Sequence, residues 1–121
     1  LNFAFDSRDM MTVWLVGHPY LNTILNRAPY ASLASRIQCR IQIEPINERD
    51  RFQSLIDHAM KHAGCSHTLL SDSGVELLRS ASMGLPRHAG RIIKGAMQLA
   101  TQQGINHLPD ELLQQTIEEL R

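Results

Sequence analysis

The sequence has no apolar run that approaches the about 18–20 residues that a membrane-spanning helix needs. Aromatic residues make up only 5% of the chain, which is ordinary for a helical protein. There are two cysteines, Cys39 and Cys65, and their wide separation in sequence is typical of a reduced, cytoplasmic protein. These absences predict a cytoplasmic chain with no membrane partner.

An excess of either charge is also lacking, because 12 Lys and Arg residues balance 12 Asp and Glu residues. Net charge therefore does not imply a polyanionic partner, and any basic surface has to be local. The chain begins at Leu1 with neither Met nor a basic region, so the N-terminus does not resemble a signal peptide. We expect the sequence to come from within a longer protein.

Complete catalytic motifs are absent as well. The sequence contains no Gly-x-x-x-x-Gly-Lys-Ser/Thr phosphate-binding loop and no Gly-x-Ser-x-Gly nucleophile elbow. No apolar strand pattern ends in paired acidic residues that could hold magnesium. The chain alone is therefore not expected to be an active enzyme.

Four potential metal ligands follow one another at His58, His62, Cys65 and His67. The two histidines four residues apart share one helix face, which is a spacing found in zinc sites. The known short zinc signatures do not match, and a structural zinc site usually needs four well-placed ligands. The alternative is a polar helix end rich in histidine, so we predict no metal site and leave the role of the cluster open.

Two segments near the N-terminus have the pattern of strands. Residues 12–16 are almost wholly apolar and are bounded by Gly17 and Pro19, which suits a strand buried on both faces. Residues 38–43 alternate between apolar and polar side chains, which is the period of a strand. With helical turns between them, these segments predict that residues 1–46 are a piece of an α/β domain.

From residue 47 onward the apolar residues recur at helical spacing, in four segments separated by short loops. Residues 47–121 are therefore expected to form a small helical bundle. The segments run from an N-cap at residues 47–50 to Gly64, from Ser71 to Gly84, from Pro86 to about Gln103, and from Pro109 onward.

Three arginines stand out by position. Gly84 ends one predicted helix and Pro86 suits the first turn of the next. Arg87 then lies in a first turn whose backbone N–H groups favour an anion, so a phosphate contact and an ordinary surface arginine both fit. Arg91 lies one turn beyond Arg87, and Arg36 directly precedes the second predicted strand.

The order of three short motifs resembles that of bacterial AAA+ ATPases. Residues 12–21 resemble the family's strand followed by Gly-Gln-Pro-x-Leu, and residues 33–46 resemble its Leu-x-x-Arg-Ile, strand and x-Pro-Leu segment. Residues 84–87 resemble the Gly-x-Pro-Arg motif that opens a lid helix. The resemblance covers essentially the whole chain, and the branch contains transposon ATP-binding regulators and the ATPase of a general-secretion assembly.

The resemblance implies an α/β fragment followed by an all-α part. Residues 1–46 would be the C-terminal piece of a P-loop-type parallel core, contributing its last two strands without the Walker A and B motifs. Residues 47–121 would be a four-helix AAA+ lid. ATP and Mg²⁺ would bind the full-length parent, and no cofactor is expected to bind this chain tightly.

The resemblance also implies roles for single residues. Arg36 falls at the arginine-finger position, which reaches a neighbouring subunit's nucleotide, and Arg87 falls at sensor 2, which contacts the γ-phosphate. Pro86 and Arg91 flank that contact. His18 falls at sensor 1, where it departs from the usual glutamine. Positive charge against the transferred phosphoryl group is what such a reaction needs.

The implied function is an oligomeric ATPase, assembled as a ring or filament, that regulates DNA transposition. A transposase and double-stranded DNA would be its partners. A secretion-machinery assembly ATPase of the same branch is the first alternative. A non-enzymatic helical adaptor is the second. It predicts that Arg87 does not face the exposed side where an ATPase core would lie, and burial of Arg87 in a salt bridge inside the bundle would support it.

Overall fold

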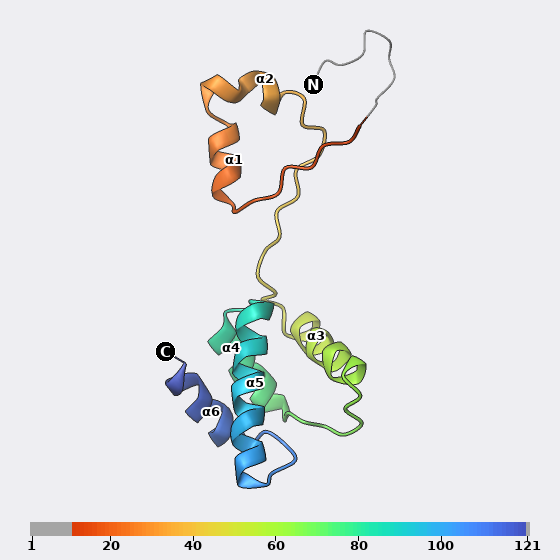
Figure 1. Ribbon diagram of the computed structural model, residues 1–121, viewed down its shortest axis with the longest axis vertical. Helices are drawn as coiled ribbons and strands as arrows, with labels where there is room; N and C mark the ends of the chain where they lie inside the picture. Colours follow the sequence, from red (N-terminus) through yellow and green to blue (C-terminus); the bar gives the residue numbers. More distant parts are fainter. Residues whose placement is uncertain (1–10, 121) are drawn as a thin grey trace. The chain divides into compact units, whose positions relative to one another are not determined.

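The computed structural model of the chain describes residues 11–120, which divide into two compact units on either side of the bond between Ile43 and Glu44 (Figure 1). The domains expected from the sequence, residues 1–46 and 47–121, remain a prediction, and the first ten residues lie outside the described part. Within residues 11–120, no helix is both long and apolar enough to cross a membrane.

The first unit contains three short helical segments. Its elements are α1 (Tyr20–Leu25), the 3-10 turn η1 (Ala28–Tyr30) and α2 (Ala31–Ala34). Leu25 is its one buried residue among those described. Side-chain hydrogen bonds hold the unit instead, since Nη1 of Arg40 donates to Oδ1 of both Asn22 (2.8 Å) and Asn26 (2.9 Å).

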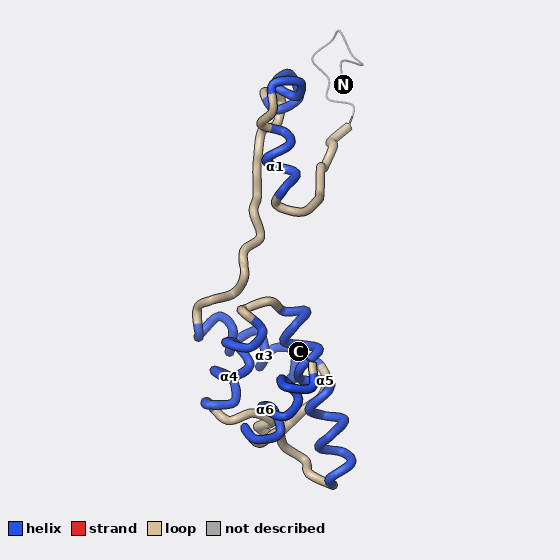
Figure 2. The backbone as a smooth tube through the Cα atoms, turned by 90° about the vertical axis from the view of Figure 1, so that its left-hand side faces the viewer, coloured by secondary structure: helices blue, strands red, loops and turns tan. Residues whose placement is uncertain are grey.

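The predicted fold class, an α/β fragment with two parallel strands followed by an all-α part, is wrong. Residues 12–16 and 38–43 contain no regular secondary structure, and no named strand occurs anywhere in the described residues (Figure 2). Their apolar side chains are exposed, with Trp14 at 77% and Ile43 at 91%. A strand requires a neighbouring strand that pairs with its N–H and C=O groups, and no described segment pairs with either one.

The second unit is a bundle of four helices, and their positions confirm those predicted from the apolar periodicity. Ser71 is the N-cap of the second helix, where its Oγ accepts a hydrogen bond from the N–H of Gly74 (2.9 Å). The helices are α3 (Arg49–His62), α4 (Asp72–Ser82), α5 (Pro86–Gln103) and α6 (Asp110–Glu119).

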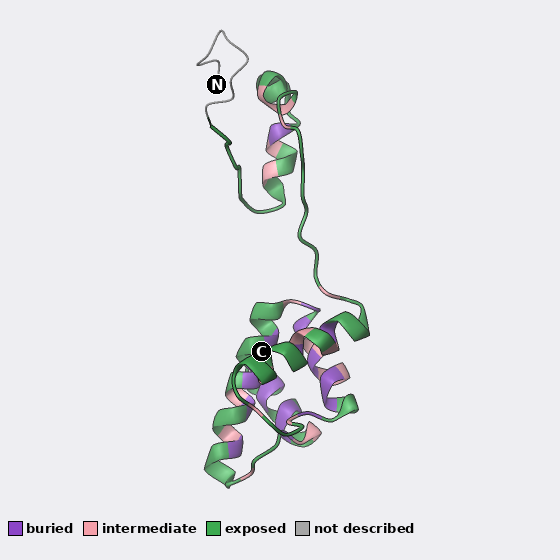
Figure 3. Cartoon of the chain, turned by 90° about the vertical axis from the view of Figure 1, so that its right-hand side faces the viewer, coloured by how far each residue is buried: buried purple, intermediate pink, exposed green. Residues whose placement is uncertain are grey.

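One apolar core lies at the centre of this bundle. The helix α5 packs against both α4 and α6, which also contact each other, and α3 packs against α4. Figure 3 shows that the buried residues line the inward sides of these helices, while the outward sides are exposed. The most deeply buried apolar residues are Phe52, Val75, Leu78, Ala89, Ala96 and Leu113. Their burial supplies the main stabilising term of the unit.

A carboxylate joins the starts of α4 and α6. Asp110 accepts hydrogen bonds from the Oγ atoms of Ser71 (2.8 Å) and Ser73 (2.5 Å). Directly before these residues, the N–H of Leu108 donates to the carbonyl of Leu69 (2.9 Å), so the two loops lie side by side. This contact fixes the beginning of the last helix against the beginning of the second.

The turn between α4 and α5 is in close contact with the segment that enters the bundle. Gly84 has a φ of +69°, in the left-handed region, and its carbonyl accepts a hydrogen bond from the N–H of Ile46 (2.8 Å). A Cβ atom at Gly84 would lie 2.5 Å from the carbonyl oxygen of Ile46. The position therefore requires glycine for two independent reasons, backbone conformation and space.

We predict that Gly84→Ala destabilises the chain by about 2–4 kcal/mol, because it combines left-handed strain with backbone overlap. The measurement is the free energy of unfolding in urea, followed by circular dichroism.

The matched control is Gly104→Ala at the end of α5, where φ is +68° but no atom lies within 4 Å of the added Cβ. This variant should lose only about 1 kcal/mol, from conformational strain alone. Equal losses in the two variants would show that the approach of Ile46 to Gly84 does not constrain the fold.

Candidate functional site at the start of helix α5

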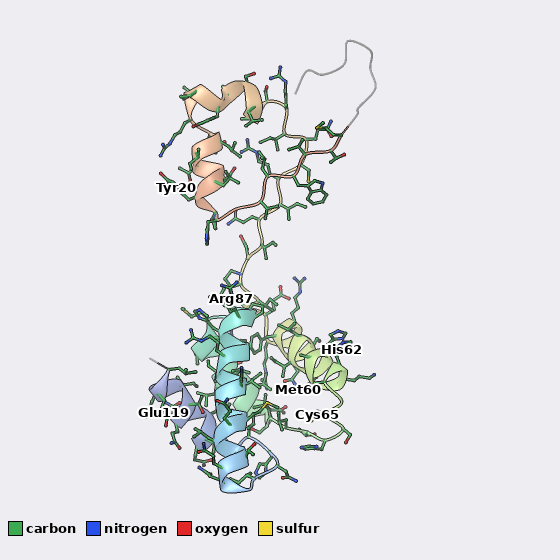
Figure 4. The ribbon with its side chains drawn as sticks, in the orientation of Figure 1. Tyr20, Met60, His62, Cys65, Arg87 and Glu119 are labelled. Carbon is green, nitrogen blue, oxygen red and sulfur yellow. The ribbon has the colours of Figure 1, made fainter. Side chains whose placement is uncertain are left out.

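The candidate site is the first turn of α5. Pro86 occupies the first helical position, where its fixed φ fits and its missing N–H costs nothing. Leu85 at the N-cap provides no side-chain acceptor, so the first N–H groups of the helix remain uncapped. Arg87 is exposed at this end of the helix (Figure 4), and Arg91 is exposed one turn further along. Two guanidinium groups and free N–H groups thus share one end of α5.

The charge distribution at this helix end differs from that of the other three helices of the bundle. The first turns of α3, α4 and α6 carry acidic residues, namely Asp50, Asp72, and Asp110 with Glu111. The first turn of α5 carries none. A cation near a helix N-terminus interacts unfavourably with the helix dipole and destabilises the helix by about 0.3–1 kcal/mol.

No ion pair within the described residues neutralises Arg87 or Arg91. The positive end of the helix dipole adds to their charge, and the uncapped N–H groups of the first turn are further hydrogen-bond donors. A bound anion would relieve this repulsion. The arrangement can therefore receive a phosphate or carboxylate group.

Arg79 on α4 hydrogen-bonds the segment that leads into the bundle. Its Nη1 donates to the carbonyl of Asn47 (2.9 Å), and its Nε donates to Oε2 of Glu76 (2.9 Å). The hydrogen bonds from Arg79, assisted by its charge, lower the pKa of the Glu76 carboxyl, while partial desolvation opposes that shift. The same hydrogen bonds raise the pKa of Arg79. Together with the contact between Ile46 and Gly84, the hydrogen bond from Arg79 to Asn47 fixes where α5 begins.

Arg36 lies in the first unit, directly after α2. Its side chain is exposed, and Nη1 donates to both the carbonyl oxygen (2.7 Å) and the Oγ (2.6 Å) of Ser32. The guanidinium is thus folded back over the preceding helical turn. Its assignment as an arginine finger stays a prediction.

His18 also lies in the first unit, just before α1. Its carbonyl accepts a hydrogen bond from the N–H of Leu21 (2.8 Å), which forms the turn into the helix, and its side chain is exposed. It does not follow a strand, because residues 12–16 are not one. Its assignment as sensor 1 stays a prediction.

The four residues considered as metal ligands separate into two pairs. The rings of His58 and His62 stack on α3 with their centroids 6.2 Å apart. His67 is turned toward the loop before α6, where its Nε2 lies 2.7 Å from the carbonyl oxygen of Asn106, and Cys65 lies beside it. Within residues 11–120, no three His, Cys, Asp or Glu side chains converge as metal ligands.

Sequence reasoning missed the role of Arg79. The three-residue spacing from Glu76 to Arg79 is a visible signal, because residues at that spacing are neighbours on a helix. The contact with Asn47 spans 32 residues, and no local pattern specifies it. The hydrogen bonds of Asp110 to Ser71 and Ser73 were missed for the same reason.

Comparisons with known proteins give one informative similarity. The sequence is 26% identical over 103 residues to general secretion pathway protein A of Aeromonas hydrophila, which covers 85% of this chain and 19% of that protein. The chain therefore spans about a fifth of the length of this relative. No family model matches the sequence, and no solved structure matches it. The similarity supports a relation to AAA+ ATPases and gives no support to a transposition regulator.

We predict that Glu76→Gln reduces the acid sensitivity of the fold. Because the native pKa of Glu76 is lowered, its charge stabilises the chain above the ordinary glutamate pKa of about 4.3. That contribution is lost as the pH falls through the lower native pKa. Urea unfolding at a series of pH values should therefore show a shallower loss of stability in Glu76→Gln than in the unmodified chain.

The control is Glu44→Gln, an exposed carboxylate with no ion pair among the described residues. It should reproduce the acid profile of the unmodified chain. A Glu76→Gln profile identical to that of the control would mean that the bond to Arg79 contributes nothing to stability.

Proposed function

We propose that this chain is part of a secretion-type AAA+ ATPase, in which residues 47–121 act as the lid over bound nucleotide. Arg87 would contact the γ-phosphate of ATP as sensor 2, with Pro86 fixing the first turn and Arg91 one turn further along. ATP and Mg²⁺ would be held mainly by other parts of the full-length protein, because this sequence has no phosphate-binding loop.

The observation that carries the proposal is the unneutralised positive charge at the start of α5. Arg87 and Arg91 are exposed there, and the first turn contains no acidic residue. Arginine suits phosphate because its planar fork stays charged and can donate two parallel hydrogen bonds. The uncapped N–H groups add further donors at this end of the helix.

Arg36 is proposed to act in trans on the nucleotide of a neighbouring subunit in a ring or filament. Its exposure supports this role, and within the described residues only its Nη1 is engaged, by Ser32. An arginine supplied by a neighbour makes hydrolysis depend on assembly. Such a residue can accelerate phosphoryl transfer by about 10³–10⁵.

Two alternatives are less well supported. The transposition regulator, with a transposase and double-stranded DNA as partners, has no support in the comparisons, whereas the similar protein is named for secretion. The non-enzymatic adaptor would be supported by an Arg87 buried in a salt bridge inside the bundle. Arg87 is instead exposed and has no ion pair within residues 11–120.

We predict that inorganic tripolyphosphate binds the chain at the start of α5 with a dissociation constant in the millimolar range. Titration followed by amide NMR should shift the resonances of Arg87, His88 and Arg91. Arg87→Ala should weaken binding about tenfold, because it removes one charge-assisted contact.

The matched control is Arg51→Ala, an exposed arginine near the start of α3 that is paired with Glu48 (2.9 Å). This variant should bind like the unmodified chain. Resonance shifts confined to other regions, or equal weakening by Arg51→Ala and Arg87→Ala, would count against the proposed phosphate contact.

We predict that Arg36→Ala, made in the full-length protein, lowers ATP hydrolysis by about 10³ or more and leaves ATP binding intact. Calorimetry measures the binding and phosphate release measures the hydrolysis. Ser32→Ala is the control, since it removes a partner of Arg36 but not its charge. Loss of ATP binding with intact assembly would contradict the assignment of Arg36 as the finger.

A further inference from the structure

We infer that Cys65 and His67 form a reactive thiol–imidazole pair that is modified by small disulfides. The pair is independent of the proposed phosphate contact. It lies in the loop between α3 and α4, close to the end of α3 (Figure 4).

His67 supplies a base beside the thiol of Cys65. The thiol of Cys65 donates a hydrogen bond to the carbonyl oxygen of His67 (3.3 Å), and its Sγ lies 3.9 Å from Nδ1 of the same residue. On the other side of the ring, Nε2 lies 2.7 Å from the carbonyl oxygen of Asn106.

A carbonyl can only accept a hydrogen bond, so Nε2 carries the hydrogen in the neutral ring. The lone pair is then on Nδ1, which faces the sulfur. Asn106, from the loop before α6, thereby holds the tautomer that can take the thiol proton. This is the arrangement of a nucleophile, a base and a group that orients the base.

The thiol is accessible to small molecules. Cys65 is half-buried and lines an open groove of about 370 Å³ beside the C-terminal half of α3. The charged side chains along this groove are Asp57, Lys61 and Asp72. Because they include both acidic and basic groups, the groove does not strongly repel a reagent of either charge. The thiolate, and not the thiol, is the attacking species, so a neighbouring base raises reactivity.

The reaction with a small disulfide balances without a further reagent. The S–H turns from the carbonyl oxygen of His67 to Nδ1 of the same residue and passes its proton there, and the sulfur of Cys65 attacks one sulfur of oxidised glutathione. The bond to Cys65 forms as the disulfide bond breaks, and one glutathione thiolate leaves. That thiolate takes up the proton from the imidazolium, so the net change is one exchanged disulfide.

Cys39 provides an internal comparison. It is exposed, and no histidine contacts it within the described residues. If accessibility alone governed reactivity, Cys39 would react faster than Cys65. If the histidine governs it, the less exposed Cys65 reacts faster.

The experiment exposes the folded chain to oxidised glutathione and follows each cysteine-containing peptide by mass spectrometry. We expect Cys65 to react about tenfold faster than Cys39, which is less than the about 10²–10⁴-fold that a positioned base typically contributes, because its Sγ lies 3.9 Å from Nδ1 of His67. His67→Gln should lower the rate at Cys65 to that of Cys39 or below, because glutamine can still donate to Asn106 but is no base. The rate at Cys39 should not change.

The control is His62→Ala, which removes a nearby histidine that stacks with His58 and should leave both rates unchanged. Circular dichroism verifies that each variant is folded, and if His67→Gln is not, His67→Asn replaces it. An unchanged rate at Cys65 in the folded variant would overturn the inference, as would faster reaction of Cys39 in the unmodified chain.

Discussion

The close approach of the Ile46 backbone to Gly84 is the constraint on which the candidate site depends. It fixes the turn between α4 and α5, and Arg79 reinforces it by holding the carbonyl of Asn47. Because Pro86 begins α5 two residues after this turn, the position of Arg87 follows from the same contact. A bulkier residue at Gly84 would therefore disturb both the entry into the bundle and the presentation of the arginines.

The start of α5 departs from the local rules that the other helices of the bundle follow. The first turns of the other three helices contain acids, whereas the first turn of α5 contains an arginine and no acid. Local sequence and helix electrostatics usually agree, and natural proteins break that agreement mainly at functional sites. The departure costs stability in the absence of an anion, which is why we place the function there.

The helices of the second unit could be predicted well from the sequence. The signals that define them, namely the helical period of the apolar residues, the N-cap at Ser71 and Gly104, which ends α5, all act within a few residues. The strand prediction at residues 12–16 and 38–43 was wrong. An apolar run or an alternating pattern shows only that a segment is compatible with a strand, whereas a strand forms only where a neighbouring segment pairs with its backbone. The site was half predictable. The position of Arg87 in a first turn followed from Gly84 and Pro86. The hydrogen bond from Arg79 to Asn47 joins residues that are too far apart in the sequence for a local pattern to predict it.

The carboxylate shared by α4 and α6 has a consequence for synthesis on the ribosome. Asp110 follows its partners Ser71 and Ser73 by 39 and 37 residues, and chains emerge from the N-terminal end. While α6 is still unmade, the start of α4 lacks its acceptor and the apolar sides of α4 and α5 lack Leu113. The nascent bundle therefore remains open until α6 emerges. A chaperone could bind it in the interval between the synthesis of α4 and the synthesis of α6.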